Sequence, residues 1–161
     1  MVILKKILDF YINSSLHVAL SAFALVSMTQ YFFGVQGDFS VAFFAFFGTV
    51  VGYNFVKYDA IARLNKTEIK NELKTIVFLS FISLLACFYF FLQLSWMSKV
   101  SAFAFFGLTL LYTLPFFPNK QNARNWKGVK IYIVGITWVG VTVILPLVEA
   151  EITFSMDVLL M

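Results

Sequence analysis

The chain has 161 residues, of which 61% are hydrophobic and 12% are charged, and its net charge is +4. Soluble domains carry about 25% charged residues, so this composition excludes an ordinary soluble protein. Cys87 is the single cysteine, which excludes a disulfide within the chain and a metal site built on several cysteines.

Five segments of the sequence contain no Asp, Glu, Lys or Arg: 17–36, 39–56, 75–98, 100–119 and 131–148. Each is close to the length of about 20 residues that a helix needs to cross a bilayer. Helices are expected because a segment in hydrocarbon must satisfy its own backbone polar groups, and the runs do not alternate as barrel strands do. The sequence therefore predicts an all-α, polytopic membrane helix bundle of about five transmembrane helices, organised as one membrane domain over 1–161.

The N-terminal stretch MVILKKILDFYINSS carries two lysines and leads into a long apolar run without a small-residue cleavage pattern. We therefore predict a retained first span at about 14–35 rather than a cleaved signal peptide. His17 near its start is a candidate functional residue, although a lone histidine there is more typical of helix packing.

The second span, predicted at about 39–57, ends in the polar sequence GYNFVKYDAIARLNK. At about 100° per residue, Asn54 and Tyr58 share a helix face, whereas Asp59 lies about 140° from Asn54. One interpretation is interfacial, with Tyr53 and Tyr58 in the aromatic belt, Lys57 snorkelling and Asn54 either capping the helix or bonded to a neighbouring helix. The other interpretation is a polar site to which Asn54 and Asp59 contribute oxygen ligands.

The third and fourth spans are predicted at about 74–95 and 98–117. The fourth ends in LPFFPNKQNARNWKGVK, where two prolines and turn residues stop the helix. Lysines and arginines that converge at the mouth of a bundle suit a phosphate or diphosphate, and here they are Lys120, Arg124, Lys127 and Lys130. Positive-inside charge with a Trp anchor is the alternative explanation.

The fifth span is predicted at about 129–148, with Pro146 near its end. A tail at 149–161 follows, and its last residues, SMDVLLM, are similar to the first turns of a sixth helix. That segment is too short to cross a bilayer.

Basic residues are distributed unevenly between the loops. Two precede the first span, five lie between the second and third spans and four lie between the fourth and fifth, so eleven of the 12 are in alternate connections. The positive-inside rule places the N-terminus and these basic loops in the cytoplasm, as in a multi-pass protein of a bacterial-type inner membrane. Topology and anionic lipid headgroups explain the basic loops, so membrane lipid is an expected partner and nucleic acid is not.

Three stretches resemble the UbiA superfamily of intramembrane prenyltransferases. GTVVGYNFVKYDAIA lies where that family has its first aspartate-rich motif, LLYTLPFFPNK is similar to its second conserved stretch, and NWKGVKIYIVGITWVGVTVILPL is similar to its fifth span. Asn54 matches the asparagine of the first motif, while Phe55 and Tyr58 stand at two of its aspartate positions and Asp59 follows one residue late.

The resemblance implies a site for Mg²⁺ and a prenyl diphosphate at the cytoplasmic end of the bundle. The metal ligands would be Asn54 and Asp59. The residues expected to bind the diphosphate are Asn54, Lys57, Tyr112, Lys120 and Arg124.

The family has about nine spans and a second aspartate motif between spans six and seven, and this chain ends before either. The expected function is therefore that of a UbiA-like prenyltransferase-fold protein. If complete, such a protein transfers a prenyl group from a prenyl diphosphate to an aromatic or lipid acceptor. This chain alone is not expected to carry out the transfer. The alternative is a small non-enzymatic multi-pass subunit that stabilises a complex with membrane protein partners.

Overall fold

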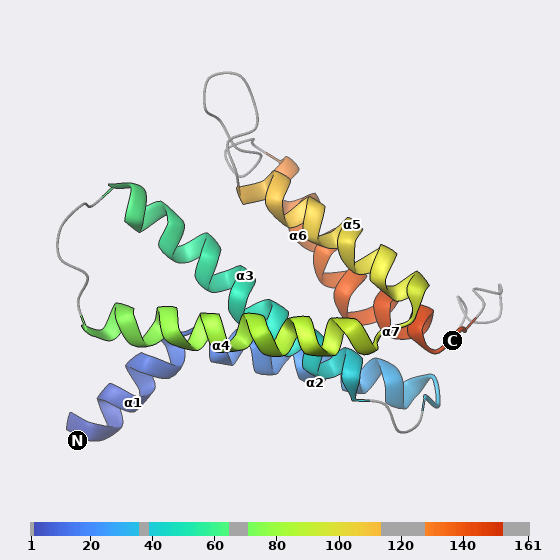
Figure 1. Cartoon of the computed structure of the whole chain (residues 1–161), viewed down its shortest axis with the longest axis horizontal. Coiled ribbons are helices and arrows are strands. Elements are labelled where there is room, and N and C mark those ends of the chain that lie inside the picture. The colour runs from blue at the N-terminus through green and yellow to red at the C-terminus, as the bar shows by residue number, and fades with distance from the viewer. Residues whose placement is uncertain (1, 36–38, 65–70, 114–127, 153–161) are drawn as a thin grey trace.

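A computed structural model of the chain describes residues 2–35, 39–64, 71–113 and 128–152 (Figure 1). The regular elements in these ranges are helices, so the all-α class predicted from the sequence is confirmed for them. They are α1 (Val2–Asn13), α2 (Leu16–Phe32), α3 (Ser40–Leu64), α4 (Asn71–Gln93), α5 (Trp96–Thr113), α6 (Val129–Val139), the π-helical turn η3 (Gly140–Ile144) and α7 (Leu145–Glu149).

Three stretches of helix in the described ranges are long and apolar enough to cross a membrane: Ser40–Tyr58, Leu73–Gln93 and Val129–Glu149. The pair Ile3–Asn13 and Leu16–Phe32 meets the same test together, but it is bent by 60°, so it adds a fourth span when counted as one. These helices fit an integral membrane protein of several spans.

The predicted fourth span, 98–117, is described only as far as Thr113 within α5. That described part is not among the helices that meet the length and hydropathy test. Five spans with a cytoplasmic N-terminus, and the UbiA-like arrangement, therefore stay predictions. Residues 153–161 of the predicted tail lie outside the described residues.

Helix α2 lies within the first predicted span, 14–35, and α1 precedes that span as a separate helix. Helix α1 ends at Asn13 and α2 begins at Leu16, and the turn between them holds Ser15 in the left-handed conformation with φ 62°. Ser14 and Ser15 are both buried, so small side chains at this elbow let the chain lie close to its neighbours. The amphipathic N-terminal segment thus leaves the axis of α2 instead of extending it.

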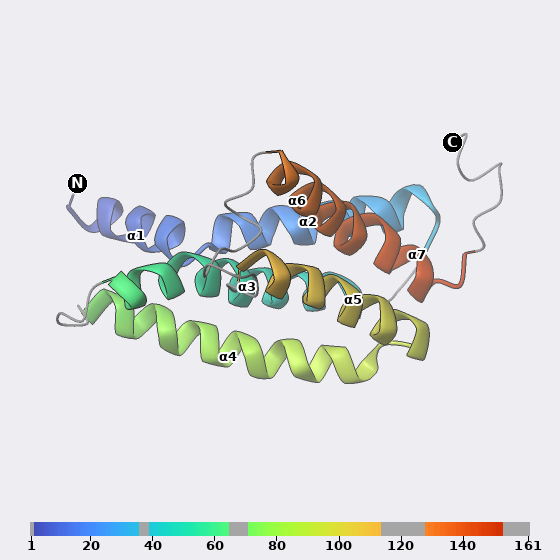
Figure 2. The ribbon, with the colours of Figure 1, turned by 90° about the horizontal axis from the view of Figure 1, so that it is seen from above.

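The helices form two groups that meet at one end of the molecule (Figure 1). Helix α3 packs most extensively on α2 and on α4, and Figure 2 shows it between them. Helices α5 and α6 lie side by side, and η3 and α7 connect them to α2 and α3. At the opposite end the α5–α6 pair diverges from α3 and α4 (Figure 1).

Small apolar residues form the core where the two groups meet. Alanines and valines let helix backbones approach closely, which is how membrane helices gain packing energy without a strong hydrophobic drive. The buried cluster contains Val26, Val41, Ala42, Ala45, Leu94, Ala102 and Leu145. Beside it, the rings of Phe43 and Phe47 stack on Phe90 with centroids 5.2 and 5.9 Å away, so part of the phenylalanine content joins α3 to α4.

Many large apolar side chains point outward instead. Phe78, Phe88 and Phe103 are each at least 60% exposed, and all three belong to the helices α4 and α5. In water such a surface would aggregate, whereas in a bilayer it is solvated by acyl chains. The outer surface of the bundle is therefore that of a protein embedded in lipid.

Candidate functional site

Asn54 is buried between α3 and α4. Its side chain is 3% exposed, and its Nδ2 donates to Ser80 Oγ at 2.9 Å, while Ser80 Oγ donates to the Ile76 carbonyl at 2.8 Å. The Asn54 Oδ1 atom is also buried and has no hydrogen-bond partner among the described residues. The Asn54 Nδ2 group therefore bonds to a neighbouring helix, which is one of the possibilities in the interfacial interpretation. The Oδ1 atom remains a buried acceptor without a partner among the described residues.

Lys57 and Tyr58 contact the elbow between α1 and α2. Tyr58 Oη donates to the Asn13 carbonyl at 2.8 Å, and Lys57 Nζ donates to the same carbonyl at 3.2 Å and to Asn13 Oδ1 at 3.4 Å. The last carbonyls of a helix lack partners within it and carry the negative end of its dipole, so a hydroxyl and an ammonium group are suitable partners here. Lys57, predicted to bind a diphosphate, thus holds the end of α1.

The contact between Tyr58 and Asn13 lies close to His17 along the chain. Helix α2 begins directly after this contact, and His17 lies in its first turn. His17 Nδ1 is a second buried atom without a hydrogen-bond partner among the described residues, and its ring lies 5.8 Å from that of Tyr11. The interior near the elbow therefore holds unsatisfied polar atoms on both helices.

Helix α3 continues without interruption to Leu64, so Asp59 stays in regular helix. Its backbone position is about 140° around the helix axis from that of Asn54. Among the described residues no group of three or more His, Cys, Asp or Glu could hold a metal ion. A Mg²⁺ ion at Asn54 Oδ1 would need further oxygen ligands, and Asp59 as one of them stays a prediction.

The other residues predicted to bind the diphosphate lie at the end of α5 and in the basic stretch between α5 and α6. Tyr112 is half-buried in the last turn of α5. Lys120 and Arg124 lie outside the described residues, so their role in binding a diphosphate stays a prediction. Lys130 is exposed in the first turn of α6.

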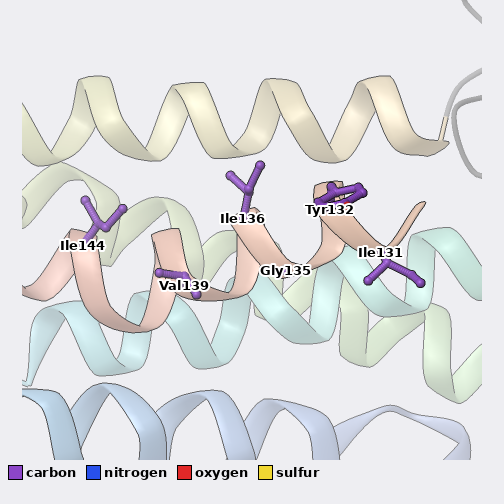
Figure 3. Close-up of a pocket in the computed structure, with 6 residues that line it drawn as sticks. All are labelled: Ile131, Tyr132, Gly135, Ile136, Val139 and Ile144. Atoms are coloured by element: carbon purple, nitrogen blue, oxygen red, sulfur yellow. The ribbon is translucent and has the colours of Figure 1, made fainter. Parts of the chain in front are cut away.

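A shallow apolar groove of about 380 Å³ lies on the exposed surface of α6 after Lys130 and is open to the outside (Figure 3). Its lining residues recur at the spacing of one helix face, and they are Ile131, Tyr132, Gly135, Ile136, Val139 and Ile144. Gly135 leaves the middle of the groove open, because a side chain there would meet nothing within 4 Å.

The π-helical turn η3 extends this groove. A π turn closes with an i to i+5 hydrogen bond and so inserts an extra residue into the helix. Val139 and Ile144 are five residues apart and would lie on different faces of a regular α-helix, yet both line the groove. The inserted residue therefore keeps the apolar face continuous past Gly140.

Two hydrogen-bonding contacts between distant parts of the chain were not predicted from the sequence. Trp138 Nε1 donates to Tyr53 Oη at 3.3 Å and thereby links α6 to α3. At the far end of the bundle, both carboxylate oxygens of Glu149 accept from the Ser95 N–H, at 3.1 and 3.0 Å. Each contact joins residues at least 54 positions apart, so spacing along the chain carries no signal for either.

No known family matches this sequence, and no curated protein or solved structure is detectably similar to it. The likeness to the UbiA superfamily accordingly rests on the three sequence stretches alone.

Proposed function

We propose that this chain is a UbiA-like prenyltransferase-fold membrane protein that binds a prenyl diphosphate. The isoprenoid tail lies along the groove of α6, and the diphosphate is held by the basic residues that precede that groove. The five-span topology places this end of the bundle, with the N-terminus and both basic loops, on the cytoplasmic side of a bacterial-type inner membrane.

The observation that carries the proposal is the continuity between a cation and an apolar groove on one helix. Lys130 is exposed and immediately precedes Ile131, the first residue of the groove. From Ile131 to Ile144 the lining extends for about 20 Å at the rise of a helix, so it suits a long chain better than a compact ring. An amphiphile with a phosphate head and an apolar tail matches both features.

Transfer of the prenyl group to an aromatic or lipid acceptor is the reaction that the resemblance implies. The described residues contribute binding and orientation: a cation for the head and a groove for the tail. Mg²⁺ at the diphosphate, and a second set of aspartates to complete its coordination, belong to the same prediction.

The test places a leucine in the groove. We expect full-length protein in lipid nanodiscs to bind a fluorescent farnesyl diphosphate analogue in the presence of Mg²⁺, and Gly135→Leu to weaken that binding about tenfold by filling the space of the tail. Lys130→Gln should weaken it by a similar factor, because a hydrogen bond to a charged group contributes about 1.5–3 kcal/mol.

Gly107→Leu is the matched control. Gly107 is an exposed glycine of α5 where an added side chain would likewise meet nothing within 4 Å, and it does not line the groove. Its variant should bind like the wild type. The proposal is wrong if the wild-type protein does not retain the analogue, or if Gly135→Leu and Gly107→Leu bind it equally well.

A second candidate is a non-enzymatic subunit that stabilises a membrane protein complex. It is favoured by the engagement of Asn54 with Ser80 and of Lys57 with Asn13, since both predicted ligands already join helices of this chain. On this alternative, Asn54→Ala and Lys57→Met lower the thermal unfolding midpoint and leave binding of the analogue unchanged, while Lys74→Met, which removes an exposed lysine of α4, changes neither. Loss of analogue binding without loss of stability would count against it.

A further inference from the structure

Helix α1 is amphipathic along its whole length. Lys5, Lys6, Asp9 and Asn13 fall within a sector of about 100° around its axis. The rest of the helix surface is apolar and includes Ile3, Leu4, Ile7, Leu8, Phe10 and Ile12.

That apolar surface is not used by the bundle. Ile3 is 77% exposed, Leu4 74% and Ile7 61%, which are among the highest values for apolar residues in the described ranges. Figure 1 shows α1 turning away from the helices that follow it. An apolar face of this size on a short helix needs a partner.

The direction of α1 is fixed by contacts at its C-terminal end. It meets α2 at 60°, with Ser15 in the left-handed conformation at the bend. Tyr58 and Lys57 of α3 both donate to the Asn13 carbonyl, so the end of α1 is fastened to the bundle rather than hinged freely. The elbow therefore sets the angle at which α1 leaves α2.

We infer that α1 lies in the membrane–water interface and binds an anionic phospholipid surface, with its apolar face among the upper acyl chains and Lys5 and Lys6 at the lipid phosphates. Helix α2 has 17 residues and rises about 26 Å, which nearly covers a hydrocarbon core of about 30 Å by itself. A straight extension of α2 would carry the apolar face of α1 through the headgroups into water, whereas a helix bent toward the membrane plane keeps that face at the acyl chains and Lys5 and Lys6 at the phosphates.

Charge selects the bilayer over a protein partner. The polar sector contains two lysines against one aspartate, and lysines beside a broad apolar face are the pattern of helices that bind anionic lipid. The prenyl diphosphate site plays no part in this inference, so either can fail without the other.

The test measures the depth of α1 in full-length protein. In a Cys87→Ser background, single cysteines replace Leu4, Leu8, Lys6 or Asp9, and a nitroxide is attached to each in nanodiscs that contain phosphatidylglycerol. We expect the labels at Leu4 and Leu8 to be accessible to oxygen and shielded from a water-soluble nickel chelate, and those at Lys6 and Asp9 to show the reverse. The two apolar positions should report nearly equal depth. A label at Phe81, an exposed residue of α4, provides the reference for a transmembrane position.

Three results would overturn the inference. Chelate access at all four positions means that α1 lies in water. Depth that increases steadily from Leu4 to Leu8 means that α1 belongs to the span. If the label at Leu4 stays shielded from the chelate in lipid-free detergent, and this shielding is lost when the protein is diluted, then α1 binds a protein partner or a second copy of the chain. Support also requires that Lys5→Gln with Lys6→Gln reduces the depth of the label at Leu4, and that nanodiscs of neutral lipid alone do the same.

Discussion

Replacing Gly140 with alanine is expected to lower the thermal unfolding midpoint of the protein in detergent by about 2–12 °C. Gly140 lies where α6 meets η3, and a methyl group there would overlap with the Cδ1, Cε1 and Cζ atoms of Phe105 on α5. Either the ring rotates out of its place or the two helices separate. Overpacking of this kind costs about 1–3 kcal/mol, and 1 kcal/mol shifts the midpoint of a chain of this size by about 2–4 °C.

Two other glycines provide the comparison. Gly135 on the same helix and Gly107 on α5 have nothing within 4 Å of an added side chain, so their alanine variants should be as stable as the wild type or slightly more so. A double variant with Phe105→Ala and Gly140→Ala should be no less stable than Phe105→Ala alone, because the overlap is then absent. Equal midpoints for Gly140→Ala and Gly135→Ala would contradict this description of the α5–α6 contact.

The helices themselves could be predicted because the signal is local. A run such as AFFAFFGTVVGYNFV is too apolar and too long to be anything but a membrane helix, and α3 does begin within a residue of the predicted span. Its end differs, since α3 continues as a helix through the polar residues to Leu64. Hydropathy predicts where the apolar environment ends, and the backbone hydrogen bonds of a helix do not stop there.

The elbow at Ser14 and Ser15 falls at the predicted start of the first span, 14–35, and the sequence also contains a signal for a separate helix before it. Before Asn13 the chain is amphipathic with a polar sector, and after Ser15 it is apolar on all sides. A change of that kind across three small polar residues indicates two helices in different environments. The mean hydropathy of the apolar segment alone does not reveal the amphipathic helix that precedes it.

The candidate site was harder to predict, because the role of a polar residue depends on contacts that sequence spacing does not contain. The resemblance implies a diphosphate at Lys57, yet its ammonium group lies at Asn13, 44 residues away. Asn54 does bond to a neighbouring helix, whereas its role as a ligand stays a prediction, since its Oδ1 atom is buried without a partner among the described residues. The groove of α6 depends on the π turn at Gly140, and no composition rule places such a turn.

Glu149→Ala is expected to destabilise the start of α5 by about 2 kcal/mol. Ser95 precedes α5, and its Oγ accepts from the Ser98 N–H at 3.3 Å, as an N-cap does. In a capping box a glutamate three residues into the helix accepts from the N-cap N–H. Here Glu149 of α7 takes that place from 54 residues away, with both oxygens within 3.1 Å of the Ser95 nitrogen. The carboxylate also meets the positive end of the α5 dipole, so its removal loses a charged hydrogen bond and a favourable field.

Glu151→Gln is the control that removes a negative charge from the same stretch without removing the hydrogen bond between Ser95 and Glu149. Glu149 and Glu151 each contribute one negative charge to the same stretch, but Glu151 is exposed at the end of the described chain. We expect Glu149→Ala to lower the unfolding midpoint by about 4–8 °C and Glu149→Gln, which keeps one acceptor, by about half as much, with no change for Glu151→Gln. Amide hydrogen exchange in the first turn of α5 should rise in the same order. If Glu149→Gln and Glu151→Gln behave alike, the carboxylate of Glu149 does not cap α5.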